Sequence, residues 1–171
     1  MDLKQHIRGI QDFPLPGILF YDISTVLSHP PAFTYCLDRL EHQLREWQPD
    51  IIAGIESRGF LFATPLAQRL QLPMMMIRKE GKLPGETRSL TYELEYGADT
   101  IEIQADALQP GQRVVILDDL LATGGTLSAS IALCESCGAH VVGCAVLIEL
   151  DFLNGRRLVN SPLISLVSYD S

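Results

Sequence analysis

Short apolar runs alternate with helix-like segments from residue 51 onward, and this alternation limits the possible folds of the chain more than any other feature. Five runs are almost wholly apolar: 51–55, 74–77, 114–117, 141–150 and 163–167. Helical patterns separate several of them, at 60–70 and 126–137. Strands read in this way when helices cover both faces of a parallel sheet. We therefore expect an α/β fold, a parallel twisted sheet with helices on both faces.

Two further helices are expected before the first of these runs. Residues 31–47 carry apolar side chains at steps of three and four, which predicts an amphipathic helix. Residues 3–9 are expected to form an opening helix, followed by a turn at 13–17 in which two prolines fix φ. With 171 residues, the chain is expected to form a single domain, 1–171.

One segment departs from the parallel pattern. Residues 90–96 alternate between apolar and mostly polar side chains, and residues 101–104 alternate again after a turn at 97–99. Such alternation is typical of half-exposed strands in an antiparallel pair. We expect a hairpin that projects from the sheet as an arm or lid and is not part of the core. Together with the loop before it, this flexible lid spans about 79–104.

Composition excludes several classes of function. Thirteen basic and 21 acidic side chains give a net charge of −8, which argues against a nucleic-acid partner, because phosphate backbones require a basic face. The longest apolar stretch, 141–148, is too short to span a membrane, and the first residues lack the apolar core of a signal peptide. We expect a cytoplasmic protein that binds neither a membrane nor nucleic acid. Cys134 and Cys137 lie in a predicted helix without a second pair, and are expected to be core neighbours.

The segment 114–126 contains the most chemically specific pattern. A buried strand ends in Asp118 and Asp119, and a diglycine turn then opens a helix. Glycines allow backbone N–H groups to approach a ligand, threonines add hydroxyls, and the helix dipole favours an anion. Thr126 could be a simple helix cap, but a cap does not require two carboxylates at the strand end. The pattern predicts a phosphate monoester site, and it matches neither the nucleotide-hydrolase loop nor the dinucleotide-binding loop.

Basic side chains gather in one part of this acidic chain. Six of the 13 lie between residues 58 and 88: Arg58, Arg69, Arg78, Lys79, Lys82 and Arg88. A basic island on an acidic protein can focus an anionic ligand, although such a run can also be a solvated loop. Arg58 follows an apolar run within the turn 56–59, and its planar guanidinium suits a diphosphate.

The segment 114–126 resembles the phosphoribosyl-pyrophosphate (PRPP) signature of the type I phosphoribosyltransferases, in the form carried by adenine-specific members. Further matches lie at 13–17, 54–60, 77–85 and 94–97. The resemblance implies the type I phosphoribosyltransferase fold with a hairpin hood, and transfer of the phosphoribosyl group from PRPP to adenine. It also implies Mg²⁺ held through PRPP and water with no direct protein ligand, and a homodimer in which Arg78 reaches across the interface.

The resemblance assigns roles to individual residues. The phosphate and ribose are expected to contact Asp118, Asp119, Ala122, Thr123, Gly124, Gly125 and Thr126. The pyrophosphate is expected to contact Glu56, Ser57, Arg58, Arg78, Lys79 and Lys82. Glu95 is the implied catalytic carboxylate, with Tyr96 beside the reacting centre and Arg58 stabilising the leaving group. From its residues alone, Glu95 reads as a solvated strand residue.

Adenine recognition is expected at Leu19, Phe20 and Tyr21, within an N-terminal base-binding segment of about 1–30. The family often carries Arg where Tyr21 stands, and a base read by backbone groups tolerates that change. Three other functions are open to this chain. Transfer to a 6-oxopurine usually requires a lysine that 141–150 does not offer. A PRPP-sensing regulator usually adds a DNA-binding domain, and an interaction module leaves the diglycine loop unexplained.

Overall fold

The computed structural model describes residues 1–171, which divide into two compact units, Met1–Arg39 and Leu40–Ser171. The first unit contains the 3₁₀ helix η1 (Leu3–His6), strands β1 (Arg8–Gln11) and β2 (Leu19–Asp22), helix α1 (Ser24–Leu27) and the start of helix α2 (Pro30–Trp47). Strands β1 and β2 form an antiparallel pair, with Arg8 opposite Asp22 and Gln11 opposite Leu19.

The opening helix predicted at 3–9 is wrong beyond its first turn. Residues 3–6 form η1, with the Asp2 carboxylate accepting a hydrogen bond from the Lys4 amide, but residues 8–11 are a strand. The reason is long-range, because these residues pair with 19–22 across the turn that the prolines form. Pairing with a distant segment overrides local helical preference.

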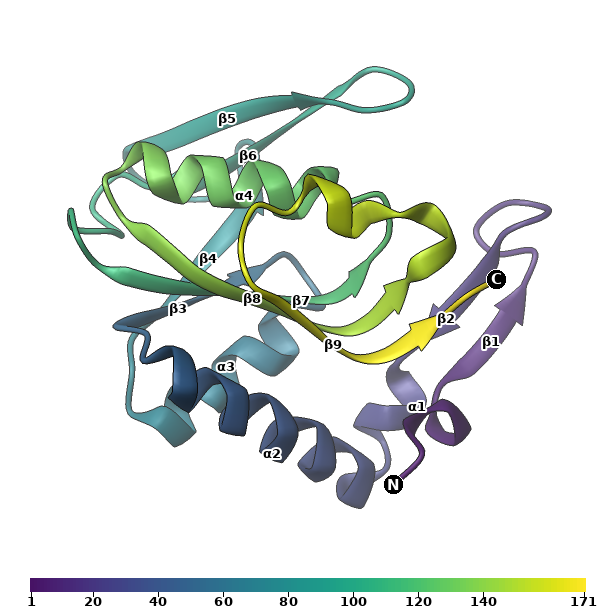
Figure 1. Cartoon of the computed structure of the whole chain (residues 1–171). Coiled ribbons are helices and arrows are strands. Elements are labelled where there is room, and N and C mark those ends of the chain that lie inside the picture. Colours follow the sequence, from purple (N-terminus) through teal and green to yellow (C-terminus); the bar gives the residue numbers. More distant parts are fainter. The chain divides into compact units, whose positions relative to one another are not determined.

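The second unit is built on one seven-stranded sheet (Figure 1). Its elements are β3 (Ile51–Ile55), α3 (Phe60–Leu70), β4 (Met74–Lys79), β5 (Thr87–Glu93), β6 (Ala98–Gln104), β7 (Arg113–Leu121), α4 (Gly125–Ser136), β8 (His140–Leu150), η2 (Asp151–Leu153), η3 (Gly155–Leu158) and β9 (Leu163–Tyr169). The strand order is β5-β6-β4-β3-β7-β8-β9, and all neighbours from β4 to β9 are parallel. The predicted α/β class is confirmed.

Helices cover this sheet on both faces (Figure 1). Helix α4 packs on β5, β7 and β8, whereas α3 packs on β3 and β7 from the other side. The end of α2 approaches β8 so closely that a Cβ on Gly143 would lie 2.4 Å from the Trp47 ring. Strand β7 lies centrally and ends beside both α3 and α4, so ligand groups placed at its carboxyl end can be reached from two helix N-termini.

The hairpin β5–β6 is attached to the sheet more firmly than its alternating sequence predicts. Strand β6 pairs with β4, with Arg78 opposite Glu102, and Ile101 and Ile103 are buried in the core. The expectation that the hairpin lies outside the core is therefore wrong for its base. Its tip, residues 94–97, does project as an exposed turn (Figure 1). The hairpin thus has an exposed tip on a base that is anchored in the core.

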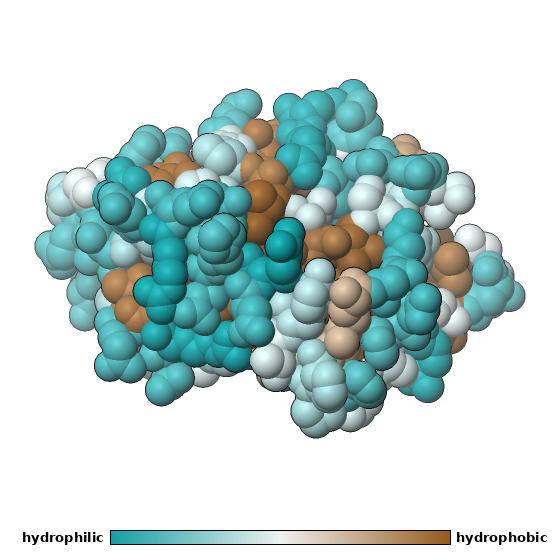
Figure 2. Space-filling model, turned by 60° about the horizontal axis from the view of Figure 1, so that its bottom comes forward, coloured by the Kyte–Doolittle hydropathy of each residue, from teal (hydrophilic) through white to brown (hydrophobic).

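No helix of the structure is long and apolar enough to cross a bilayer. On the face shown in Figure 2, apolar groups reach the surface in separate patches among hydrophilic ones. Three short segments contain much of the exposed apolar surface: Phe13, Leu15 and Ile18; Leu94 and Tyr96; Phe152, Leu153 and Leu158.

Candidate active site

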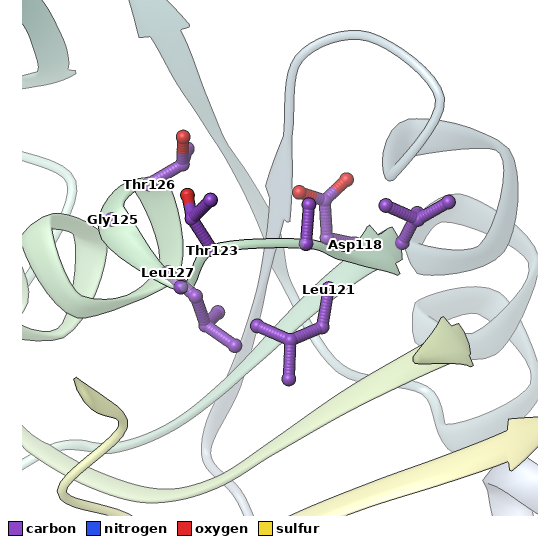
Figure 3. Close-up of a pocket in the computed structure, with 9 residues that line it drawn as sticks. Asp118, Leu121, Thr123, Gly125, Thr126 and Leu127 are labelled. Carbon is purple, nitrogen blue, oxygen red and sulfur yellow. The ribbon is translucent and has the colours of Figure 1, made fainter. Parts of the chain in front are cut away.

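A pocket of about 90 Å³ lies where β7 passes into α4 (Figure 3). It is lined by Asp118, Leu120, Leu121, Ala122, Thr123, Gly124, Gly125, Thr126 and Leu127. Figure 3 shows the carboxylate of Asp118 and the hydroxyls of Thr123 and Thr126 on one side of the loop, with Leu121 and Leu127 directed to the other. The buried leucines anchor a loop whose polar groups remain available to a ligand.

Backbone packing holds this loop, through a pair of glycines. Gly124 has a φ of +88°, and a Cβ there would lie 2.3 Å from the Gly155 carbonyl oxygen. A Cβ on Gly155 would lie 2.2 Å from the Ala122 carbonyl oxygen. The loop before α4 and the turn η3 therefore touch through their main chains, which shapes the anion-binding concavity that the sequence predicts.

Asp118 and Asp119 leave the end of β7 in different directions, since neighbouring strand residues face opposite sides of a sheet. Asp118 lines the pocket, whereas the Asp119 carboxylate is buried and lies 2.8 Å from Nε of Arg58. Burial, and then the charge of Asp119, raise the pKa of Asp118 well above its usual range. A carboxylate in this state favours a ligand that donates hydrogen bonds or carries positive charge.

Glu56 organises basic residues at the end of β4 and in the turn after it. Its carboxylate accepts hydrogen bonds from Arg78 Nη2 at 3.2 Å, the Lys79 amide at 2.8 Å and Lys82 Nζ at 2.8 Å. Burial acts to raise the pKa of Glu56, but the bonds from Lys82, Lys79 and Arg78 outweigh it and hold the pKa at about 2. Glu56 therefore acts as an internal counter-ion, and Ser57 beside it is exposed.

The hairpin contacts the first turn of α4, beside the pocket, through Tyr92. Its hydroxyl lies 3.0 Å from Thr126 Oγ1 and 3.5 Å from Asp99 Oδ2, and Asp99 also forms an ion pair with Lys79. Glu95 and Tyr96 lie beyond this contact, in the exposed turn. Side chains thus link the hairpin to the first turn of α4 and to the basic segment, which comprises Arg78, Lys79 and Lys82.

The three residues expected to bind a base lie together on β2, in the first unit. Leu19 is exposed, Phe20 is half-buried, and Tyr21 is buried. The Phe20 ring packs edge-to-face on Phe13, with centroids 5.1 Å apart. Burial raises the pKa of Tyr21. An aromatic face suits stacking on a planar heterocycle.

Sequence reasoning missed the turn that supports the loop. Glu149 is buried, and its carboxylate accepts hydrogen bonds from Arg156 Nε at 2.8 Å, Arg156 Nη2 at 2.5 Å and Ser165 Oγ at 2.7 Å. Arg156 directly follows Gly155 and also donates to the Leu163 carbonyl. A signal was present, because a lone glutamate inside the apolar run 141–150 needs a cationic partner.

Comparison with known proteins extends the resemblance of the sequence motifs over almost the whole chain. The phosphoribosyl transferase domain family matches residues 23–162. The adenine phosphoribosyltransferase of Gluconacetobacter diazotrophicus is 61% identical over 170 residues, covering 99% of this chain and 97% of that protein. The adenine phosphoribosyltransferase structure from Thermoanaerobacter pseudethanolicus has a TM-score of 0.94 at 50% identity, and 98% of each chain is covered. The enzyme from Saccharomyces cerevisiae, in complex with D-2,5-dideoxy-2,5-imino-altritol 1,6-bisphosphate and adenine, has a TM-score of 0.90 at 41% identity, covering 96% of each chain.

Proposed function

Because this chain belongs to the phosphoribosyl transferase family, among the adenine phosphoribosyltransferases, we propose a reaction for it. It transfers the phosphoribosyl group of PRPP to adenine, giving AMP and pyrophosphate. The observation that carries the proposal is the pocket between β7 and α4, where a carboxylate, two hydroxyls and a glycine-shaped turn face one cavity. The matched family region spans both compact units, which supports treating residues 1–171 as one phosphoribosyltransferase domain.

The loop from Ala122 to Thr126 would hold the 5′-phosphate. Main-chain N–H groups of Gly124 and Gly125 and the hydroxyls of Thr123 and Thr126 supply donors at the N-terminus of α4, where the helix dipole favours an anion. Asp118 would accept hydrogen bonds from the ribose hydroxyls. Asp119 would act beside it while held by Arg58.

The basic segment would receive the diphosphate. Cleavage of the bond between the anomeric carbon and the pyrophosphate oxygen leaves that oxygen with the bonding electrons, so negative charge grows on the leaving group. Arg78, Lys79 and Lys82 gather around Glu56 and can transfer their hydrogen bonds to this charge. Ser57 and Arg58 follow on the turn after β3.

Glu95 would act on the base. As a nitrogen of the purine's five-membered ring bonds to the anomeric carbon, its N–H proton must leave, and a carboxylate can accept it. The exposed tip of the hairpin carries Glu95 and Tyr96, and closure of this tip over bound PRPP would exclude the water that hydrolyses it. Leu19, Phe20 and Tyr21 would hold the ring.

Magnesium fits this site as a partner of the substrate. The described residues contain no group of three or more His, Cys, Asp or Glu side chains that could hold a metal ion. Asp118 offers one carboxylate to the pocket. Held by PRPP and water beside Asp118, Mg²⁺ would supply charge neutralisation of the leaving diphosphate.

Two further features complete the proposal. A homodimer follows from the family, and the exposed apolar segments around Phe13 and Phe152 offer surface for such a contact. A cytoplasmic location agrees with four cysteines that are all free thiols, because reducing compartments keep thiols unpaired.

AMP formation from adenine and PRPP with Mg²⁺ tests the proposal, with hypoxanthine and guanine as competing bases. We expect AMP from adenine and little product from the two 6-oxopurines. Glu95→Gln and Arg58→Ala should each lower kcat by at least about tenfold, whereas Glu93→Gln, on the same hairpin, should change it little. Product from a 6-oxopurine instead would contradict the base assignment, and PRPP binding without turnover would favour a regulator.

A further inference from the structure

Tyr92 is a hairpin residue that reaches the phosphate loop, and neither the sequence motifs nor the proposed reaction uses it. It lies on β5, half-buried against the core cluster. A Cβ added to Gly125 would lie 3.7 Å from the Tyr92 ring, so the ring covers the first turn of α4. Its hydroxyl is 3.0 Å from Thr126 Oγ1.

The direction of this hydrogen bond determines what Thr126 can offer a ligand. A hydroxyl has one proton to donate and two lone pairs with which to accept. When Tyr92 donates to Thr126, the Thr126 proton is available for a phosphate oxygen. When Tyr92 accepts from Thr126, that proton is used within the protein.

Asp99 is the competing acceptor for the Tyr92 proton. Its Oδ2 lies 3.5 Å from the Tyr92 oxygen, which is 0.5 Å farther than Thr126 Oγ1, and it is already paired with Lys79. The shorter distance and the neutralised carboxylate both favour donation to Thr126. A charged acceptor beyond Thr126, such as a phosphate, strengthens that direction further.

We propose that Tyr92 is a positioning residue that orients the Thr126 hydroxyl toward the phosphate of the ligand and ties the hairpin to the occupied loop. This inference rests on the proposed function, in which the loop from Ala122 to Thr126 holds the 5′-phosphate. Strand β5 continues from Tyr92 through Glu93 into the turn that carries Glu95. Phosphate binding therefore stabilises the hairpin through β5, the strand that leads to the Glu95 carboxylate.

Tyr92→Phe is the direct test, because it removes one oxygen and keeps the ring over Gly125. The matched control is Thr91→Val. Thr91 pairs with Thr100 on the same hairpin through hydroxyls 2.8 Å apart, one position away and on the opposite face of the strand. We would measure the Kd of ribose 5-phosphate by calorimetry, the KM values of PRPP and adenine, and the Tm of the ligand-free protein.

We expect Tyr92→Phe to weaken ribose 5-phosphate binding and to raise the KM of PRPP by about three- to tenfold, the usual effect of losing one hydrogen bond. The adenine KM, the ligand-free Tm and all parameters of Thr91→Val should stay within about twofold, or about 2 °C, of wild type. A loss shared equally by both substrates, or a lower Tm with unchanged affinity, would overturn the proposal in favour of simple packing.

A double-mutant cycle establishes whether the effect passes through Thr126. In a Thr126→Ala background, Tyr92→Phe should change the Kd of ribose 5-phosphate by less than about twofold, whereas in a Thr126→Ser background the full effect should remain. An equal effect in both backgrounds contradicts the inference. Wild-type protein that binds ribose 5-phosphate but makes no AMP would refute the proposed function alone, since the cycle measures binding without turnover.

Discussion

Gly124 and Gly155 meet main chain to main chain, and neither position has room for a side chain. A Cβ on Gly124 would lie 2.3 Å from the carbonyl oxygen of Gly155, and real Cβ atoms do not approach oxygen so closely. One glycine precedes α4 and the other opens η3, 31 positions later in the chain (155 − 124). This contact fixes the position of the loop before α4, which lines the pocket.

Replacing Gly124 by alanine should abolish tight PRPP binding. Both a left-handed φ and a backbone collision oppose the new methyl group, so the loop must move. We expect the KM of PRPP to rise by at least about tenfold. Gly111→Ala is the matched control, because Gly111 has a φ of +84° with open space around it. It should lower the Tm through strain alone and leave the KM unchanged, and equal effects of the two substitutions on KM would contradict the collision argument.

The Glu149–Arg156 pair should stabilise the protein more than an ordinary surface ion pair. Glu149 is only 3% exposed, whereas the Arg156 side chain is 49% exposed, so water can solvate part of the cation once the Glu149 charge is removed. We expect Glu149→Gln to lower the free energy of unfolding by about 1.5 kcal/mol in urea titrations. Arg157→Ala, at the exposed neighbour of Arg156, should change it by less than about 0.5 kcal/mol. If Glu149→Gln unfolds at the wild-type urea midpoint, the pair does not hold η3.

Glu56 should stabilise the protein over a defined range of pH. Its pKa of about 2 is below the value of about 4.3 in unfolded chains, so the folded state binds the proton less tightly. The stabilisation is complete above about pH 5 and is lost as pH falls from about 4.3 toward 2. The difference in unfolding free energy between wild type and Glu56→Gln should therefore be constant from pH 5 to 8 and shrink below pH 4. A difference that grows in acid would contradict this assignment.

The Asp118 carboxylate should affect stability in the opposite sense to Glu56, because its ionised form is disfavoured in the folded state. Burial and the charge of Asp119 raise its pKa, so ionisation at pH 7 costs the ligand-free protein stability. Asp118→Asn keeps the shape and can still accept from the Asp119 amide, 2.8 Å away in the wild type. We expect the free energy of unfolding to rise at pH 7 and this gain to disappear toward pH 4, with kcat/KM for PRPP lowered at least about tenfold. A destabilised variant at pH 7 would show that the charge is compensated without ligand.

Much of this architecture could be predicted because its signals are local. Continuous apolar runs identified all five parallel strands, and the glycines and carboxylates at 118–126 located the pocket. The errors arose where distant segments decide. The strand at 8–11 exists because of its pairing with 19–22, and Ile101 and Ile103 are core residues because β6 pairs with β4.

The residues that support the site could not be predicted for the same reason. Gly155 has no local reason to be glycine until Ala122 is seen against it, since its φ lies outside the left-handed region. Tyr92 reads as an ordinary strand residue until α4 lies beside β5. Contacts between segments far apart in sequence depend on topology, and periodicity alone carries no information about them.

The carboxylate of Glu56 has a consequence for the choice of anion in a cell. It already occupies the basic segment with a single negative charge, bonded by two cations and one amide. Chloride or another singly charged anion gains nothing by displacing it, because it brings no more charge than the resident group and must also lose its own water. A diphosphate carries several charges and can engage the same donors more strongly. In the proposed diphosphate site, such competition would favour anions with several charges over abundant singly charged ones.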